Sequence, residues 1–380
     1  MTSGKIPVVS PDDQKVTFIE LFFDLVFVFC VTQVAALFHG HFDLRTAGGA
    51  LLVFWLVWWA WTQFTWALNA ANTDHPAVQA TTMVATAVAF FMAVGIPQAL
   101  GPGAFWFAAP YVAVRAIGLL LYYRVAWTDP AQRRAVRIFG LSSLAGLVAV
   151  LAGALFGGSL LYWLWGVAIA LDLAAAGVGG QLEGWNLHPE HFAERHGLIV
   201  IIALGETLIV AAAGLSGAPR NLETIATGAL TVAVTCGLWW SYFRGARGCL
   251  EDAMHARQGA ARSCLARDIF SVVHFPMLCG VIGMAAATEL ALAHPGESLA
   301  LGARTALGAG AVLFVSGTGA AIWRCTGRAP VARFLLPAAG GAAVVAFGHA
   351  PALAMALLLA TLVALALAEG RGVPEALDHG

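Results

Sequence analysis

The sequence has few charged residues. They make up 11% of the 380 residues, whereas apolar residues make up 60% and the mean hydropathy is positive. A soluble globular chain of this length carries about twice that charged fraction. The composition therefore excludes an ordinary soluble domain and favours a polytopic membrane protein whose main partner is the lipid bilayer. The net charge of −1 says nothing about other partners, and we expect no nucleic acid among them.

Motifs for familiar chemistry are also missing. The six cysteines form neither a C-x-x-C pair nor a metal-ligand spacing, so we interpret them as reduced, small apolar residues. The chain has no phosphate-binding P-loop, no G-x-G-x-x-G after a strand and no G-x-S-x-G. We therefore assign no catalytic residue, no metal and no cofactor from sequence, and we lean against an enzyme.

A signal peptide is not recognisable either. Residues 1–17 are hydrophilic and lack the basic region and short apolar stretch of a secretory signal. We expect this segment to be a cytoplasmic tail. The apolar run that follows is then an uncleaved membrane span.

Apolar runs of about 20 residues, the length that crosses a bilayer as a helix, recur along the whole chain. They predict an all-α integral membrane protein with about twelve transmembrane helices. The break between the last two is thin, because only His349-Ala350-Pro351 separates them. The expected spans are 18–38, 48–68, 78–99, 104–124, 138–156, 160–178, 197–214, 224–243, 268–291, 300–323, 332–348 and 350–369.

Basic residues agree with this division. With twelve spans and a cytoplasmic N-terminus, sixteen Lys and Arg residues fall on the inner side and three on the outer side, and Arg115 lies within a span. Such an excess is the positive-inside pattern. It predicts a multi-pass protein of the bacterial inner membrane with both termini in the cytoplasm.

The two halves of the chain resemble each other weakly. The aromatic run 58–64 is similar to 239–244, at an offset that also places Asp24 beside Glu206. We expect two parallel six-helix repeats. The predicted parts are a tail over 1–17, a first repeat over 18–178, a cytoplasmic His/Glu-rich linker over 179–196, a second repeat over 197–369 and a cytoplasmic tail over 370–380.

Five Asp, Glu, Arg or His side chains lie away from the ends of the expected spans, in the inner half or the middle of the membrane: Asp24, Arg115, Asp172, Glu206 and His274. Such groups are costly in a bilayer and normally face protein or water. A structural ion pair of Arg115 with one of the carboxylates is one interpretation. The acids nevertheless outnumber the bases, which favours protonated acids or a site for a cation or proton. We predict that these five residues form an ion-binding, substrate-binding or proton-relay site.

Glu20 has a simpler explanation, because Thr17-x-x-Glu20 has the spacing of a helix capping box. We interpret it first as a cap. It lies one turn before Asp24 on the same helix face, so it is also a secondary candidate for the site.

Two further polar segments supply secondary candidates. His191 and Glu194 could ligate a metal by spacing, but at a helix entry the acid more simply favours the N-terminal dipole. Asn72 and Asp74 indicate a helix-ending turn followed by a cap. The secondary candidates are Glu20, Asn72, Asp74, His191, Glu194, Arg195 and His196.

Two long motifs stand out in the sequence. One is the run 20–28, Glu-Leu-Phe-Phe-Asp-Leu-Val-Phe-Val; the other is His191-x-x-Glu-Arg-His-Gly-Leu, which continues to Gly205-Glu206. Both resemble motifs of the bacterial low temperature requirement A (LtrA) family. The resemblance covers nearly the whole chain. It implies a polytopic inner-membrane protein but no specific molecular activity. Polar positions that the family also tends to carry are Asn72, Asp74, Arg115, Asp172 and His274-Phe275-Pro276.

Three functions fit these observations. The first is a transporter or an ion- or proton-coupled permeability protein that uses the intramembrane carboxylates. The second is a membrane-embedded enzyme for a lipid or isoprenoid, with the same acids as general acid and base. The third is a non-catalytic membrane factor in cold adaptation. The sequence does not predict the substrate or the oligomeric state.

Overall fold

The computed structural model describes residues 7–11, 14–38, 41–181 and 185–370. The predicted C-terminal tail lies, from residue 371 on, outside the described residues, as do parts of the predicted N-terminal tail. The described residues are helical apart from turns and one isolated β-bridge between Val9 and Ala71. The α-helices are α1 (Phe18–Ala36), α2 (Leu44–Ala70), α3 (Pro76–Gly95), α4 (Ala104–Val125), α5 (Pro130–Phe156), α6 (Gly158–Gly180), α7 (Pro189–Gly217), α8 (Leu222–Phe243), α9 (Arg247–His255), α10 (Gly259–Ala266), α11 (His274–Ala293), α12 (Leu301–Thr326), α13 (Ala332–Phe347) and α14 (Pro351–Gly370).

The all-α membrane fold that the sequence predicts is confirmed. Within the part of the chain that the structure describes, eleven helical segments are long and apolar enough to cross a membrane. The remaining expected span, 332–348, corresponds to α13, an apolar helix of 16 residues. At 1.5 Å per residue α13 is about 24 Å long, shorter than a hydrocarbon core of about 30 Å.

The chain divides into two compact units. The first comprises Met1–Leu37, Ala47–Ile199 and Met254–Arg267, and the second comprises Phe38–Thr46, Val200–Ala253 and Asp268–Gly380. The first unit draws on the first predicted repeat together with the start of α7 and all of α10. The internal repeat itself stays a prediction.

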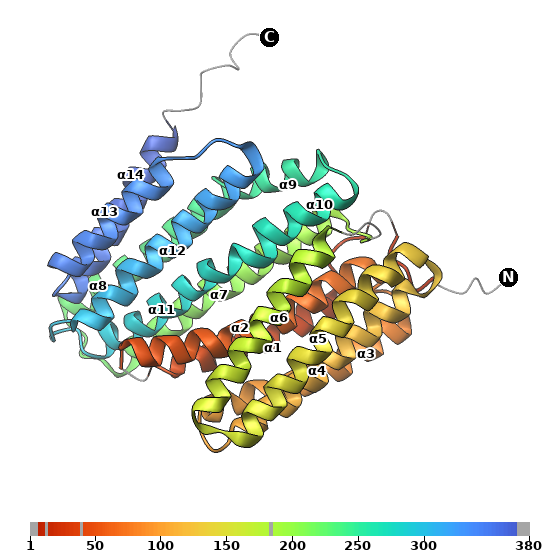
Figure 1. Ribbon diagram of the computed structural model, residues 1–380. Helices are drawn as coiled ribbons and strands as arrows, with labels where there is room; N and C mark the ends of the chain where they lie inside the picture. The colour runs from red at the N-terminus through yellow and green to blue at the C-terminus, as the bar shows by residue number, and fades with distance from the viewer. Residues whose placement is uncertain (1–6, 12–13, 39–40, 182–184, 371–380) are drawn as a thin grey trace, which may run out of the picture. The chain divides into compact units, whose positions relative to one another are not determined.

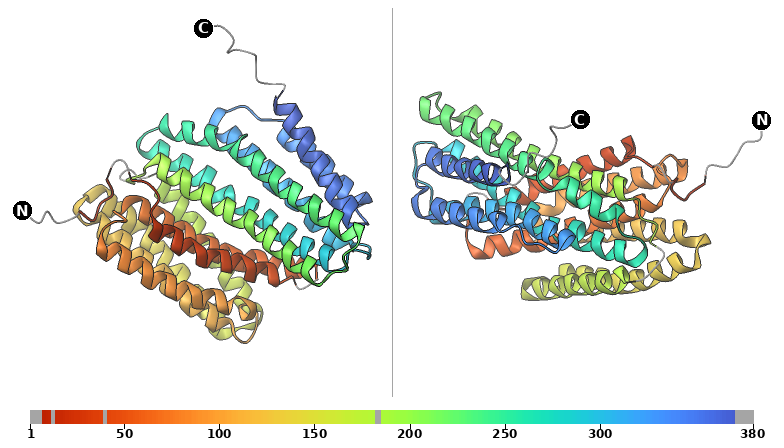
Figure 2. Two further views of the ribbon diagram at one scale, coloured as in Figure 1. Left: turned by 180° about the vertical axis from the view of Figure 1, so that it is seen from behind. Right: turned by 90° about the horizontal axis from the view of Figure 1, so that it is seen from above.

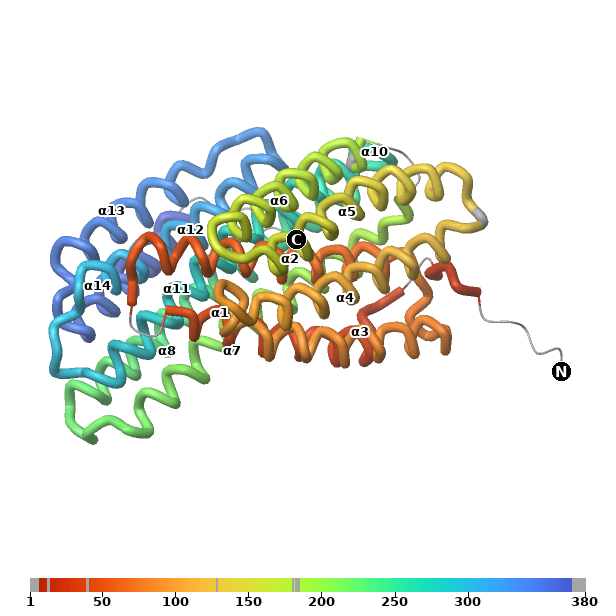
Figure 3. Tube along the Cα trace, turned by 60° about the horizontal axis from the view of Figure 1, so that its bottom comes forward, coloured from red at the N-terminus to blue at the C-terminus, as the bar shows by residue number. Residues whose placement is uncertain are grey.

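In the first unit, α3 packs between α1 and α4, and α5 packs between α4 and α6 (Figure 1). The chain reverses between α5 and α6 at Gly157 and Gly158, whose φ angles of 66° and 57° suit glycine. The resulting hairpin is visible where α5 and α6 run side by side (Figure 3). The indole of Trp165 closes it by donating a hydrogen bond to the Val150 carbonyl at 3.0 Å.

In the second unit, α12 packs between α11 and α13, and α14 contacts both α13 and α8 (Figure 2). Small residues permit the close approach of these helices. A Cβ added at Gly280 of α11 would lie 2.5 Å from the Gly310 carbonyl oxygen of α12, and one added at Gly308 would lie 2.7 Å from that of Gly341 in α13.

The structure differs from the prediction of a linker over residues 179–196. Helix α7 begins at Pro189 and runs 29 residues, so the His/Glu motif lies on the helix itself. Proline suits the first turn of a helix because its missing N–H has no intrahelical acceptor there. Except for the half-buried Glu194, the candidate residues of this motif are buried side chains of α7 rather than exposed groups of a linker.

Candidate functional site

A cluster of charged side chains is buried in the first unit, between α1 and the start of α7. Glu20 and Asp24 stand one turn apart on α1, as their spacing predicts, and both face Arg195 of α7. The guanidinium nitrogens Nη1 and Nη2 of Arg195 donate to Glu20 Oε1 and Asp24 Oδ1, each at 2.7 Å. The side chains of all three residues are 0% exposed. We call Glu20, Asp24, Arg195 and His191 the acidic cluster.

Glu20 caps its helix and also belongs to this cluster. The backbone N–H and the hydroxyl of Thr17 each donate to Glu20 Oε2 at 3.0 Å, which is the contact that the capping-box spacing predicts. The same carboxylate accepts from Arg195 and from His191, whose Nε2 lies 3.0 Å from Oε1. Capping is therefore only part of the role of Glu20.

Asp24 has one oxygen engaged and one without a partner. Oδ1 accepts hydrogen bonds from Arg195 and from the indole nitrogen of Trp61, the latter at 2.8 Å. Oδ2 is buried and has no hydrogen-bond partner among the described residues, and the same holds for Nε of Arg195. A buried carboxylate oxygen without a donor is costly when the group is ionised.

The hydrogen-bond network assigns His191 as a neutral imidazole. The Asn69 carbonyl oxygen accepts from the backbone N–H of His188 at 2.8 Å, so its amide nitrogen faces His191 Nδ1, also at 2.8 Å. Nδ1 then accepts, and the ring proton resides on Nε2 and is donated to Glu20. Both ring nitrogens of His191 are thus engaged by protein groups, and we assign it no metal.

The charges of the acidic cluster do not balance. With both carboxylates ionised, two negative charges face the single positive charge of Arg195, because His191 is neutral in this network. One additional proton or monovalent cation would neutralise the cluster. The open position for it is Oδ2 of Asp24, the buried oxygen that lacks a donor.

The indole of Trp61 packs against the guanidinium of Arg195. The centre of the Arg195 guanidinium lies 5.8 Å from the ring centroid of Trp61, within the range of a cation–π contact. The His196 ring meets Trp61 edge-on with centroids 5.0 Å apart, and its Nδ1 lies 2.9 Å from the Phe192 carbonyl oxygen one turn earlier. These contacts fix the direction from which Arg195 reaches the two acids.

Arg115 does not pair with Asp24. It forms a two-pronged pair with Asp172, at 3.2 Å from Nη1 to Oδ2 and 3.0 Å from Nη2 to Oδ1. Its remaining donors reach Gln63 Oε1, the Tyr111 hydroxyl and Ser143 Oγ. All five N–H groups of this buried arginine are therefore used, and its charge is matched by one carboxylate. The Arg115–Asp172 pair is a closed structural contact within the first unit.

His274 lies in the second unit, where its two ring nitrogens also have defined neighbours. Nδ1 is 2.7 Å from the Ile269 carbonyl oxygen, so it carries the proton and donates. Nε2 then accepts from the Tyr242 hydroxyl at 2.8 Å. Ile269 belongs to a single stretch of π-helix, Arg267–Val272, which precedes α11. The geometry is that of a neutral packing histidine.

Glu206 is buried in α7, eleven residues after Arg195. Eleven residues make about three turns, so the two positions lie on the same face of this helix, about 16 Å apart along its axis. The next residue, Thr207, hydrogen-bonds Thr235 of α8 at 3.0 Å. The pairing of Glu206 with Asp24 as repeat-related sites stays a prediction.

Asn72 and Asp74 form the turn that the sequence indicates between α2 and α3. Asn72 Oδ1 accepts from the backbone N–H of Asp74 at 3.0 Å, and its amide donates to the Pro7 carbonyl at 3.0 Å. His75 then caps α3 by accepting from the Ala77 N–H at 3.1 Å. Asn72 thus anchors the N-terminal segment, while the side chain of Asp74 is exposed.

Sequence reasoning missed several polar partners. Trp61 and Asn69 hold the acidic cluster from α2, and Arg333 pairs with Glu369 in the second unit at 2.5 Å from Nε to Oε1. The tandem tryptophans of α2 were a visible signal for Trp61, because a buried indole N–H needs an acceptor. Arg333 gave no such signal, since its place at the start of an apolar run fits the positive-inside pattern equally well.

Comparison with known proteins shows to which family the chain belongs. The sequence model described as "Bacterial low temperature requirement A protein (LtrA)" matches residues 15–368. The chain belongs to this family. It is also 29% identical, over 321 residues, to an uncharacterised protein of Rhizobium meliloti (strain 1021), an alignment that covers 81% of this chain and 77% of that protein. No solved structure was found to match. Both motifs that suggest LtrA membership in the sequence contribute side chains to the acidic cluster.

Proposed function

We propose that this LtrA protein is an ion- or proton-coupled membrane transport or permeability protein, and that Asp24 is its proton-binding group. The observation that carries the proposal is the charge excess of the acidic cluster together with the open Oδ2 of Asp24. In keeping with the distribution of basic residues, we place the protein in the bacterial inner membrane with both termini in the cytoplasm.

The physical argument rests on the cost of an uncompensated charge in a medium of low dielectric constant. A buried acid with excess negative charge around it favours its neutral form or a bound cation. When Asp24 is protonated, Glu20 and Arg195 remain as a one-to-one pair. When it is ionised, Arg195 is shared between two carboxylates. Asp24 can therefore exist in two charge states inside one preformed site, which is what coupling to a proton or cation requires.

Thr17 connects the acidic cluster to the N-terminal end of α1. Its half-buried hydroxyl donates to Glu20, which shares Arg195 with Asp24. With the predicted orientation, this end of α1 faces the cytoplasm. Protons would then reach Asp24 from the cytoplasmic side by way of the entry to α1.

The test is proton flux into proteoliposomes that contain the purified protein and a trapped pH-sensitive dye. We expect the wild type to dissipate an imposed pH gradient and the Asp24→Asn variant to lose this flux, because an amide cannot carry the proton. Asp129→Asn is the matched control, since it removes an exposed acid of the same unit and keeps a side chain that can cap α5. Folding of each variant is checked by thermal unfolding in detergent.

Equal flux in the wild type and the folded Asp24→Asn variant would exclude Asp24 as the coupling group. Lipid profiling of a deletion strain, done alongside the flux measurement, distinguishes an enzyme from a transporter. A missing lipid or isoprenoid product in that strain, with no flux in vesicles of wild-type protein, would favour an enzyme over a transporter.

A further inference from the structure

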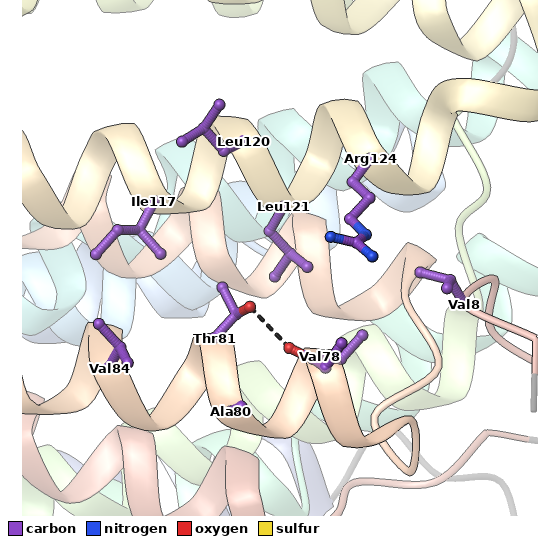
Figure 4. Close-up of a pocket in the computed structure, with 10 residues that line it drawn as sticks. Val8, Val78, Ala80, Thr81, Val84, Ile117, Leu120, Leu121 and Arg124 are labelled. Carbon is purple, nitrogen blue, oxygen red and sulfur yellow. Dashed lines mark hydrogen bonds between the residues drawn. The ribbon is translucent and has the colours of Figure 1, made fainter.

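An apolar groove lies between α3 and α4 in the first unit, away from the acidic cluster. Its volume is about 590 Å³, within the range of small-molecule sites. Val78, Val84, Ile117 and Leu121 form its walls, and among the described residues that line it the only charged side chain is Arg124, at one end (Figure 4). Val84 is 55% and Leu120 is 70% exposed, so the groove opens toward the lipid side of the helices.

A second hollow of about 630 Å³ continues from the same end. It shares Val8, Leu120 and Arg124 with the groove and adds the exposed aromatic residues Tyr123 and Trp127. Exposed Tyr and Trp side chains are typical of the level of the lipid headgroups. Arg124 therefore stands at the junction between an apolar groove and an aromatic hollow at the membrane surface.

The charge of Arg124 is available to a ligand. Its side chain is exposed, and no hydrogen bond or ion pair joins its guanidinium to another of the described residues. The polar neighbour within the groove, Thr81, donates its hydroxyl to the Ala77 carbonyl at 2.7 Å and so does not compete for the ligand. Residues 124–137 contain four arginines and one aspartate, which makes this end of the groove attractive to an anion.

From these observations we infer that the groove is a binding site for an anionic phospholipid. One acyl chain lies between α3 and α4, and the phosphate lies against Arg124 with the glycerol and headgroup in the aromatic hollow. Seven residues separate Ile117 from Arg124, so the groove extends about 10 Å along α4, which is about two thirds of the hydrocarbon thickness of one leaflet. The segment around Val8, tied down by Asn72 through the Val8 and Pro7 carbonyls, closes the surface end.

The experiment is native mass spectrometry of the delipidated full-length protein titrated with phosphatidylglycerol or phosphatidylcholine of identical acyl chains. We expect the first phosphatidylglycerol to bind more tightly than the first phosphatidylcholine. Arg124→Gln should weaken phosphatidylglycerol binding about fivefold, equivalent to about 1 kcal/mol for one basic residue at the membrane surface. It should leave phosphatidylcholine binding nearly unchanged.

Arg134→Gln is the matched control, because it removes an exposed arginine of α5 that does not line the groove. Ala80→Trp tests the acyl-chain part, since Ala80 is an exposed lining residue where an indole fills the groove without entering the core. It should abolish the first binding event for both lipids, and Val84→Trp should do the same if Ala80→Trp folds poorly.

Each of these results would overturn the inference: equal affinities for the two lipids, an equal loss in the Arg134→Gln control, or unchanged binding in folded tryptophan variants. Inorganic phosphate serves as a competitor. Displacement of phosphatidylglycerol by millimolar phosphate would also contradict the inference, because it would show that the groove does not hold the lipid by its acyl chain.

Discussion

At the scale of single residues, Arg195 determines how the candidate site is held together. Among the described residues it is the one cation that contacts both Glu20 and Asp24, and it reaches them from α7 at 2.7 Å on each side. Removing one member of a buried ion pair costs about 3–5 kcal/mol, because the remaining charge is left uncompensated. The stability of the acidic cluster therefore depends on Arg195, because this residue compensates two buried carboxylates. It does not depend on the charge of Asp24, because that charge is in excess.

This asymmetry gives the first stability prediction. Arg195→Leu should lower the free energy of unfolding by about 3–5 kcal/mol, because two buried carboxylates lose their cation. Asp24→Asn should not destabilise the protein, because it brings the cluster to charge balance. Thermal unfolding in detergent measures both. If Asp24→Asn destabilised the protein as much as Arg195→Leu, the charge-excess argument would be wrong.

The Arg115–Asp172 pair gives a second stability prediction. Arg115→Leu leaves Asp172 buried without its cation and should cost about 3–5 kcal/mol. The double variant with Asp172→Leu removes both charges and should recover most of that loss, since well-packed apolar residues often replace a buried pair at little cost. The same unfolding assay applies. A double variant no more stable than Arg115→Leu alone would show that Asp172 does more than balance Arg115.

At the scale of elements, close helix packing in the second unit depends on particular glycines. Gly280 and Gly283 lie on the same helix, α11, three residues apart. A Cβ at Gly280 would lie 2.5 Å from the Gly310 carbonyl oxygen, whereas one at Gly283 would have its nearest neighbour, the Ala306 carbonyl oxygen, at 3.9 Å. A Cβ at Gly280 therefore requires the backbone of α12 to shift, whereas a Cβ at Gly283 makes ordinary van der Waals contact.

The pair supplies a matched comparison. Gly280→Ala should destabilise the protein by about 1–3 kcal/mol, the usual cost of overpacking. Gly283→Ala should be neutral or slightly stabilising, because alanine favours the helix more than glycine does. Unfolding midpoints in detergent or lipid discs compare the two. Similar midpoints for both variants would mean that α11 and α12 have room to separate.

At the scale of the whole molecule, the membrane topology depends on α13. This helix is shorter than the hydrocarbon core, and Arg333 near its start is buried against Glu369 of α14, Thr318 of α12 and Ser241 of α8. An arginine that is buried in protein and paired with an acid can lie below the membrane surface, because its charge does not face the lipid. The predicted topology therefore requires α13 to cross despite its length.

Reporter fusions test this topology. Fluorescent-protein fusions should be bright after Gly327 and after the C-terminus, which we predict to be cytoplasmic. Alkaline-phosphatase fusions should be active after Gly217 and after His349, which we predict to be outside. If α13 does not cross, the fusion after His349 will report the cytoplasm and the C-terminal fusion will report the exterior.

The fold followed from the sequence to a large extent, and the site only in part. Apolar runs predicted helices that the structure confirms, because such runs reflect the local cost of placing polar groups in hydrocarbon. Asp24 stood out for the same reason. Its partner could not be found from sequence. Arg115 was the one arginine inside an expected span, whereas Arg195 fell in the predicted linker, a segment that is in fact the first turns of α7.

By itself, the sequence determined the class of protein, the approximate helices and the capping of α1. These properties depend on composition and on spacing along one helix. Only the tertiary structure decided that Asp172 balances Arg115 and that Arg195 and Trp61 hold Asp24 through one oxygen, leaving the other open. Such pairings join residues up to 171 positions apart in the chain, and they are set by how the helices pack rather than by any local pattern.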